Sequence, residues 1–263
     1  MAFREENTLI EIATHAAREA GRVLLEKYSQ PQNIKIKGER DIVTEADLAA
    51  ETVIMQAILA GCPDAWIVSE ETHSQRTGSM DRPTWYIDPL DGTTNYSRGL
   101  PPFSVSIAMA RQGQVESAVV YDPINGHMFH AQRGQGAYLN DRQLHVSQVD
   151  ALMDTILLLD WPRDQDIRQK SARSLLQLVP LTNAVRSTGS AALSLCYIAA
   201  GWADVYFQYT LSPWDVAAGL LMIQEAGGTI SGIDGRPFNL EQPDWLATNG
   251  LLHQNVLDLE PFE

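Results

Sequence analysis

The sequence predicts a mixed α/β (α+β) fold in which layered sheets are covered by helices. Two amphipathic helical stripes come first, at residues 8–28 and 44–60. Short apolar strands, separated by glycine and proline, then follow one another up to about residue 132. Strands and helices alternate through the second half, and this order is typical of sheets covered by helices. No internal repeat is visible, so we do not expect a solenoid or a propeller.

Both predicted helices carry their apolar residues on one side. Residues 8–28 place charges opposite a stripe formed by Leu9, Ile12, Ala13, Ala16, Ala20, Val23 and Leu24. The second helix opens on Thr44-Glu-Ala-Asp47, which resembles a capping box because an acidic residue follows the threonine by three positions. Its apolar stripe consists of Leu48, Val53, Ile54, Ala57 and Ile58.

Brief runs of aromatic and β-branched residues predict buried strands after the second helix. Residues 66–69 and 84–88 each lead into carboxylates. Residues 103–111, 115–121 and 127–132 are separated by turns with glycine or proline, so this half should form an antiparallel sheet. In the second half we expect strands at 154–160, 183–187, 203–208, 228–232 and 244–248, and helices at 165–178, 189–200, 214–226 and from about 250.

We expect two lobes that form one structural unit. Residues 1–150 would form an N-terminal lobe with two helices, an antiparallel sheet and the metal-binding motifs described below, and residues 151–263 a C-terminal α/β lobe. The expected boundary, residues 145–153, has no shift in composition, and no Gly/Ser linker separates the halves. Two lobes with a shared interface therefore fit better than two independent domains.

Composition excludes several classes of protein. Lys and Arg number 19 against 33 Asp and Glu, a net charge of −14, which disfavours nucleic acid as a partner. No apolar run is long enough for a membrane span. The first residues are partly acidic and include no apolar core of a signal peptide, so we expect a cytoplasmic protein. Cys62 and Cys196 are too few for a disulfide framework or a thiolate zinc site, and both are expected to be buried.

The segment most suggestive of chemistry is Trp85-Tyr-Ile-Asp88-Pro-Leu-Asp91-Gly-Thr-Thr-Asn95. Two carboxylates stand three residues apart where a buried strand becomes a turn, which Pro89 and Gly92 can make sharp. If Gly92 opens a helical turn, free backbone N–H groups and the Thr93 hydroxyl would form a cradle for phosphate. Carboxylates beside an anion cradle require a cation.

Further carboxylates stand at other strand or helix ends. Glu70 follows the strand at 66–69, Asp47 lies in the first turn of the second helix, and Asp215 lies in the first turn of another. Each has an ordinary explanation alone, as a turn residue, a solvated charge or a favourable charge at a helix N-terminus. If the fold gathers them, their repulsion would amount to several kcal/mol unless metal ions compensated it. Oxygen ligands then indicate Mg²⁺, with Mn²⁺ or Ca²⁺ as alternatives.

Two motifs together resemble the signatures of the inositol monophosphatase family: Asp88-Pro-Leu-Asp91-Gly-Thr93 and Trp214-Asp215-Val-Ala-Ala-Gly219. Supporting matches are Asp41-Ile-Val-Thr44-Glu-Ala-Asp47, Ser69-Glu70-Glu71, Arg186-Ser-Thr-Gly-Ser-Ala191-Ala and Glu225-Ala-Gly-Gly228. The resemblance covers essentially the whole chain. It implies a layered α/β/α/β/α sandwich of the sugar-phosphatase type, a Mg²⁺-dependent and lithium-sensitive phosphomonoesterase, and a homodimer.

The resemblance also implies roles for individual residues. Two or three Mg²⁺ ions, for which Mn²⁺ could substitute, would be held by Glu70, Asp88, the Leu90 carbonyl, Asp91 and Asp215. The catalytic residues would be Asp47, Thr93 and Glu70, with Thr93 and the Asp47 behind it orienting a metal-activated water. The substrate-binding residues would be Asp91, Gly92, Thr93, Ala191 and Gln208, with the N–H groups of Gly92 and Thr93 on the phosphate.

The sequence departs from the family pattern at two positions. Ser69 replaces the glycine that most members carry before the paired glutamates, which would alter the loop without removing a ligand. Gln208 stands where inositol-specific members place a glutamate, and an amide keeps an acceptor but loses the charge. The segment Lys35–Asp41 aligns with a mobile part of the family, where a lysine would approach phosphate or belong to a solvated run of charges.

We therefore expect hydrolysis of a small phosphate monoester, with inositol 1-phosphate or a related polyol phosphate as substrate. Within the same chemistry, the alternatives are fructose-1,6-bisphosphatase, histidinol-phosphate phosphatase and 3′-phosphoadenosine 5′-phosphate phosphatase. A non-catalytic cation-binding regulatory module is an alternative of another class. The expected partner is a small-molecule phosphate monoester, with neither nucleic acid nor a membrane.

Overall fold

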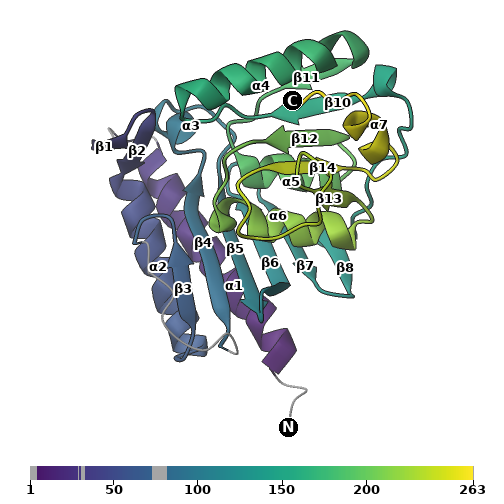
Figure 1. Cartoon of the computed structure of the whole chain (residues 1–263). Coiled ribbons are helices and arrows are strands. Elements are labelled where there is room, and N and C mark those ends of the chain that lie inside the picture. The colour runs from purple at the N-terminus through teal and green to yellow at the C-terminus, as the bar shows by residue number, and fades with distance from the viewer. Residues whose placement is uncertain (1–4, 29, 31–32, 73–81, 263) are drawn as a thin grey trace.

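Five layers make up the structure (Figure 1), a computed structural model that describes residues 5–28, 30, 33–72 and 82–262. The helices α1 (Glu5–Tyr28) and α2 (Glu45–Gly61) cover one face of a seven-stranded sheet. Helices α5 (Ala191–Ala199) and α6 (Pro213–Glu225) separate this sheet from a five-stranded one. Helix α4 (Gln165–Leu178) and the short α7 (His253–Leu257) pack outside the second sheet. The α/β/α/β/α sandwich is confirmed.

The seven-stranded sheet carries its strands in chain order. They are β3 (Trp66–Ser69), β4 (Thr84–Asp91), β5 (Ser104–Arg111), β6 (Gln114–Asp122), β7 (His127–Gln132), β8 (Gly136–Leu139) and β9 (Arg142–Gln143). Neighbours are antiparallel except β3 and β4, which pair in parallel. The prediction of an antiparallel sheet was wrong for this pair. The long connection between the two strands permits a parallel return, which a tight turn would not.

The five-stranded sheet has the order β11-β10-β12-β14-β13. Strands β10 (Ile156–Leu159), β11 (Ala184–Arg186) and β12 (Val205–Gln208) are parallel, whereas β13 (Thr229–Ser231) and β14 (Trp245–Thr248) complete the sheet with antiparallel pairs. Helices α4 and α5 provide the crossovers between the parallel strands, as parallel pairing requires. Short 3₁₀ turns lie at Leu152–Asp154 and Val179–Leu181.

A separate hairpin precedes α2 and was not predicted. Strand β1 (Ile34–Gly38) pairs antiparallel with β2 (Asp41–Thr44). Every residue of β1 is exposed, so no buried face produces the sequence signal of a strand. The hairpin includes the segment Lys35–Asp41, for which the sequence indicated no strand, and it lies beside α2 and α3 (Thr93–Ser97).

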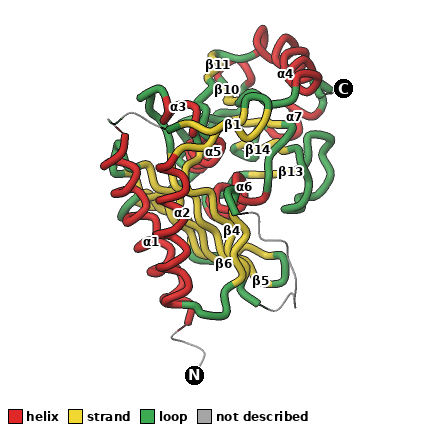
Figure 2. Tube along the Cα trace, turned by 90° about the vertical axis from the view of Figure 1, so that its left-hand side faces the viewer, coloured by secondary structure: helices red, strands yellow, loops and turns green. Residues whose placement is uncertain are grey.

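Three apolar layers hold the sheets and helices together. In Figure 2, α1 and α2 lie along the left-hand side of the strands of the first sheet. The fully buried Ile54 of α2 and Trp85 of β4 belong to the apolar layer between these helices and the sheet. The central layer joins residues of β5–β8 to α5 and α6, and the outer layer joins the second sheet to α4 and α7. This packing brings the acidic ends of β3 and β4 to the same side of the molecule as the first turns of α2 and α6.

The two cysteines differ in burial. Cys196 is fully buried in α5, but Cys62 is only half-buried, because it follows the last residue of α2 at the surface. The prediction of two buried thiols was therefore wrong for Cys62.

Across the part of the chain that the structure describes, none of the helices combines the length and apolar character needed to cross a bilayer.

Candidate active site

The strand end at Asp88 and Asp91 leaves the regular ladder. Pro89 has no N–H to donate, and the pairing of β4 with β5 is irregular between Asp88 and Asp91. The Leu90 N–H donates to Oδ1 of Asp88 at 3.0 Å. This local bond fixes the Asp88 side chain, which is 1% exposed, where the strand turns.

Thr93 lies directly after that turn and contacts the predicted partner Asp47. Gly92 has φ of 100°, a conformation that favours glycine, and it caps α3. The Thr93 Oγ1 lies 3.0 Å from Oδ1 of Asp47 and 3.0 Å from the Leu90 carbonyl oxygen. The other Asp47 oxygen accepts the N–H and the hydroxyl of Thr44, at 2.8 and 2.6 Å, in the capping box of α2. Asp47 is thus buried behind Thr93.

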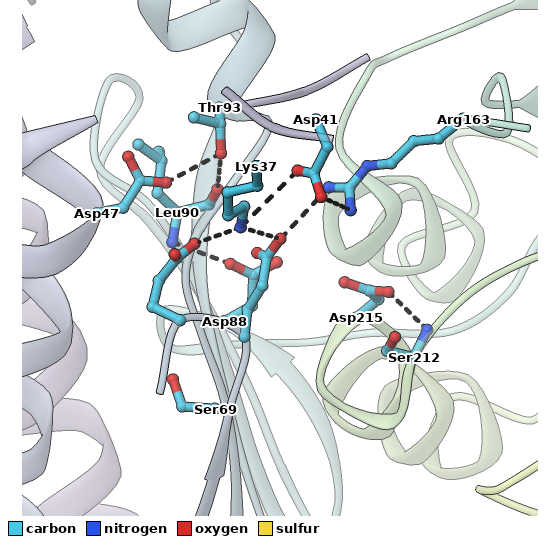
Figure 3. Close-up of polar contacts among 12 residues, drawn as sticks. Lys37, Asp41, Asp47, Ser69, Asp88, Leu90, Thr93, Arg163, Ser212 and Asp215 are labelled. Carbon is cyan, nitrogen blue, oxygen red and sulfur yellow. Dashed lines mark hydrogen bonds and ion pairs between the residues drawn. The ribbon is translucent and has the colours of Figure 1, made fainter. Parts of the chain in front are cut away.

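Glu70 follows β3 and lies between two cations. Its Oε1 is 3.1 Å from Nζ of Lys37 and 3.3 Å from Nη2 of Arg163. Lys37 Nζ also lies 2.8 Å from Oε1 of Glu71 and 3.8 Å from Oδ1 of Asp41. Figure 3 shows Lys37 reaching from the β1–β2 hairpin into this group. Burial raises the pKa of Glu71 to about 7, although its bond with Lys37 opposes the rise.

Asp91 is held by the beginning of α5, about a hundred residues away in the chain. The Ser190 hydroxyl and the Ala192 N–H donate to Oδ2 at 2.6 and 2.8 Å. The Ala191 N–H donates to Oδ1 at 3.3 Å. A helix N-terminus favours a carboxylate because its first N–H groups have no partner within the helix.

Asp215 occupies the corresponding first turn of α6. Its Oδ2 accepts the Ser212 N–H at 2.7 Å, which completes a capping box, and Pro213 begins the helix. Figure 3 places Asp215 across the site from Asp88, on the side of Arg163.

These residues surround one cavity of about 1370 Å³. The predicted site residues among its lining are Glu70, Asp88, Leu90, Asp91, Gly92, Thr93, Ala191, Gln208 and Asp215. Asp47 does not line the cavity and reaches it through Thr93. Cationic side chains line the cavity as well, among them Lys37, Arg40, Arg163 and Arg168.

A comparison with protein families shows which family this chain matches. The model of the inositol monophosphatase family matches residues 5–260. The chain belongs to this family. It is 37% identical to an inositol-1-monophosphatase of Mesorhizobium japonicum, over 95% of each chain. It is 42% identical to the Nus factor SuhB of Escherichia coli, over 86% of each chain.

Solved structures of the inositol monophosphatase family share the fold. An IMPase from Thermotoga maritima superposes with a TM-score of 0.87 at 32% identity, covering 95% of each chain. Family membership supports a phosphatase function for the chain.

Electrostatics in the cavity favour a bound cation. Burial and then the charges of Glu70 and Asp91 raise the pKa of Asp88 and of Asp215 well above the usual range. Burial also raises the pKa of Asp91 to about 7, against the opposing bonds from Ser190 and Ala192. Buried carboxylates of like charge must bind protons or a cation, because their mutual repulsion has little solvent to screen it.

The donor set fits the Mg²⁺ that the inositol monophosphatase family implies. All the predicted ligand atoms are oxygens, which Mg²⁺ prefers. Within the described residues, no three His, Cys, Asp or Glu side chains are already gathered as a ligand group. Lys37 and Arg163 instead contact Glu70, and protein donors occupy oxygens of Asp91 and Asp215. A cation at Glu70 would therefore need Lys37 and Arg163 to move away from that carboxylate.

Sequence reasoning missed part of the cavity wall. Arg163 and the buried Asp160 line it, but neither belongs to a recognisable motif. Gln208 is where it was expected, yet its amide is turned to the backbone. Its Nε2 donates to the Asp160 carbonyl at 3.0 Å, and its Oε1 accepts the Tyr209 N–H at 2.9 Å. The continuous apolar runs of β10 and β12 indicate buried strands and carry no signal for these contacts.

Proposed function

We propose that the protein is a Mg²⁺-dependent hydrolase of a small phosphate monoester, with inositol 1-phosphate or a related polyol phosphate as its substrate. The observation that carries the proposal is the arrangement of the carboxylates. Glu70, Asp88, Asp91 and Asp215 come from three separate segments, the end of β3, β4 and the first turn of α6, and line one cavity, which also contains Thr93. Family membership independently supports a phosphatase.

The metal would be held by oxygens of the predicted ligands Glu70, Asp88, Leu90, Asp91 and Asp215. When bound, Mg²⁺ would lower the pKa of a water molecule and stabilise the charge on the leaving oxygen. The N–H groups of Gly92 and Thr93 would bind phosphate oxygens at the start of α3.

Thr93 and Asp47 would orient the attacking water. Because Asp47 accepts the hydroxyl proton of Thr93, the threonine oxygen presents a lone pair to a neighbouring donor. A water placed against that lone pair would have its own oxygen directed toward phosphorus, which is the geometry that in-line displacement needs. Besides Thr93 and Asp47, the proposal includes Glu70 as a third catalytic residue.

The wall beside Gln208 bears on the choice of substrate. An amide with both polar ends bonded to the backbone offers less attraction for ring hydroxyls than a free carboxylate. Fructose 1,6-bisphosphate, histidinol phosphate and 3′-phosphoadenosine 5′-phosphate therefore belong in the substrate panel. The homodimer and the cytoplasmic location expected from the resemblance are part of the same proposal.

Asp91→Asn tests the chemistry. Purified protein should release phosphate from inositol 1-phosphate or another panel member in Mg²⁺, and we expect the variant to lose at least about 100-fold in kcat because a metal ligand loses its charge. Asp141→Asn makes the same change at an exposed turn residue and should retain wild-type kcat. An unchanged rate in Asp91→Asn would exclude its role.

A second candidate is a cation-binding regulatory module without turnover, since some relatives carry a name other than that of a phosphatase, Nus factor SuhB. Calorimetry separates the two candidates. Mg²⁺ binding with no phosphate release from any panel member would favour the second, and Mg²⁺-dependent release would exclude it.

A further inference from the structure

Asp160 is a buried carboxylate at the end of β10 that no motif explains. Its Oδ1 accepts the Gly189 N–H at 2.7 Å and the Ser187 hydroxyl at 3.1 Å. Its Oδ2 lies 3.3 Å from the Ser194 hydroxyl and 3.4 Å from the Tyr206 hydroxyl. Both oxygens are therefore bonded within the protein, and the stronger contacts go to the loop of residues 187–190.

The same loop is fixed from its opposite side by α3. The Asn95 side chain donates to the Thr188 carbonyl at 2.8 Å. Gly189 has φ of 75°, and a Cβ there would lie 2.8 Å from Nδ2 of Asn95. Because Asp160 and Asn95 bond opposite ends of the same peptide group, the Thr188 carbonyl and the Gly189 N–H, the loop has little freedom to shift.

The next residues of this loop hold the proposed metal ligand Asp91. Ser190 follows Gly189 directly, and Ser190, Ala191 and Ala192 supply the three donors to the Asp91 carboxylate. Three donors from one rigid turn determine the plane of that carboxylate and which lone pairs face the cavity. A displacement of Gly189 would move all three donors together.

We propose that Asp160 is a positioning residue for Asp91, acting through Gly189 and the first turn of α5. The catalytic part of this inference rests on the proposed function, whereas its metal-binding part does not. Partners behind a metal ligand typically change metal affinity or activity by about 10-fold to 100-fold when removed. Asp160 is bonded to the loop rather than to the ligand itself, so the lower end of that range applies.

The test compares Asp160→Ala with Asp160→Asn. Titration calorimetry with Mg²⁺ alone should show about tenfold weaker binding for Asp160→Ala, and kcat should fall while KM changes by less than about twofold. Asparagine keeps an oxygen that can accept the Gly189 N–H. Asp160→Asn should therefore retain most of the Mg²⁺ affinity and most of the kcat that Asp160→Ala loses. A partly unfolded sample would lower the apparent kcat and the number of Mg²⁺ sites per chain but not the affinity of the folded sites, so the Mg²⁺ affinity is the measurement that identifies a positioning role.

Asp204→Ala is the matched control. Asp204 is also buried beside the second sheet and accepts one hydroxyl, from Ser147, and one backbone N–H, from Ile156. It does not line the cavity, so its removal should lower the melting temperature without changing Mg²⁺ affinity. If Asp160→Ala does not fold, the double variant Ser187→Ala, Ser194→Ala should still weaken Mg²⁺ binding, by about threefold.

The inference would be overturned if folded Asp160→Ala bound Mg²⁺ as tightly as wild type. If Asp160→Ala does not fold, the same result in the double variant would overturn it. So would an equal loss of affinity in Asp204→Ala. A wild-type protein that binds Mg²⁺ but releases no phosphate would overturn the proposed function alone, since the calorimetry still tests Asp160. A wild-type protein that binds no Mg²⁺ would overturn both.

Discussion

At the scale of single residues, hydrogen bonds decide what the acidic side chains of the cavity can do. Asp47 and Asp88 are equally buried aspartates, but their partners differ. Asp47 accepts three donors and stands behind Thr93, whereas Asp88 accepts the Leu90 N–H and faces the cavity. The first arrangement suits orientation of a neighbouring hydroxyl, and the second leaves oxygens for a cation.

Replacing Thr93 tests that division. Thr93→Val keeps the shape but removes the hydroxyl, so kcat should fall at least about 100-fold, the usual effect of losing a group that orients proton transfer. Thr93→Ser keeps the bond to Asp47 and should stay within about tenfold of wild type. Thr52→Val is the control, because Thr52 is exposed on α2 and bonds only its own helix. Phosphate release under saturating substrate measures all three, and a fully active Thr93→Val would exclude the role.

At the scale of elements, local pattern predicted most of the structure. Helix α4 spans the predicted 165–178, and β7 spans the predicted 127–132. Helix α4 is amphipathic, and turns with glycine bound β7 on both sides. The hairpin of β1 and β2 was missed because an exposed strand buries no face, and the parallel register of β3 and β4 depends on a connection whose path local pattern does not encode.

The glycine that ends the second signature motif has an element-scale explanation. Gly219 lies in α6 against α5, and a Cβ there would meet the Leu195 side chain, with Cδ1 only 2.5 Å away. Gly219→Ala should therefore lower the free energy of unfolding by about 1–3 kcal/mol through overpacking. Gly61→Ala is the matched change at the end of α2. Its new methyl would meet only the flexible end of Ile12, so its loss should be smaller. Urea denaturation measures both, and equal stabilities would contradict the packing argument.

At the scale of the whole molecule, the site exists only where distant segments meet. Strand ends and helix starts could be predicted to carry Glu70, Asp88, Asp91 and Asp215, because residue type and local pattern are both visible in the sequence. The contacts of Asp160 with the loop of residues 187–190 could not, since they join segments through tertiary packing alone. The central apolar core also includes residues of both predicted lobes, which supports our proposal of one structural unit.

The cluster of carboxylates should also make stability depend on pH and on divalent cations. Burial and mutual repulsion raise the pKa values of Asp88 and Asp215, and burial raises that of Asp91 to about 7. In the unfolded chain such groups lose their protons near pH 4. Between about pH 4 and 7 the folded state therefore binds more protons, and the metal-free protein loses stability as the pH rises.

Mg²⁺ should reverse this loss, because it binds the ionised carboxylates of the folded state. We expect the rise in melting temperature on adding Mg²⁺ to be larger at pH 8 than at pH 5.5, where protons compete with the ion. Calorimetric melting of metal-free protein with Mg²⁺ or with KCl at equal ionic strength measures the difference, and KCl controls for screening. Asp91→Asn removes one of the carboxylates for which protons and Mg²⁺ compete. The Mg²⁺-induced rise in melting temperature should therefore differ less between pH 5.5 and pH 8 in this variant. A Mg²⁺ effect that is equal at both pH values would show that these carboxylates do not bind the ion.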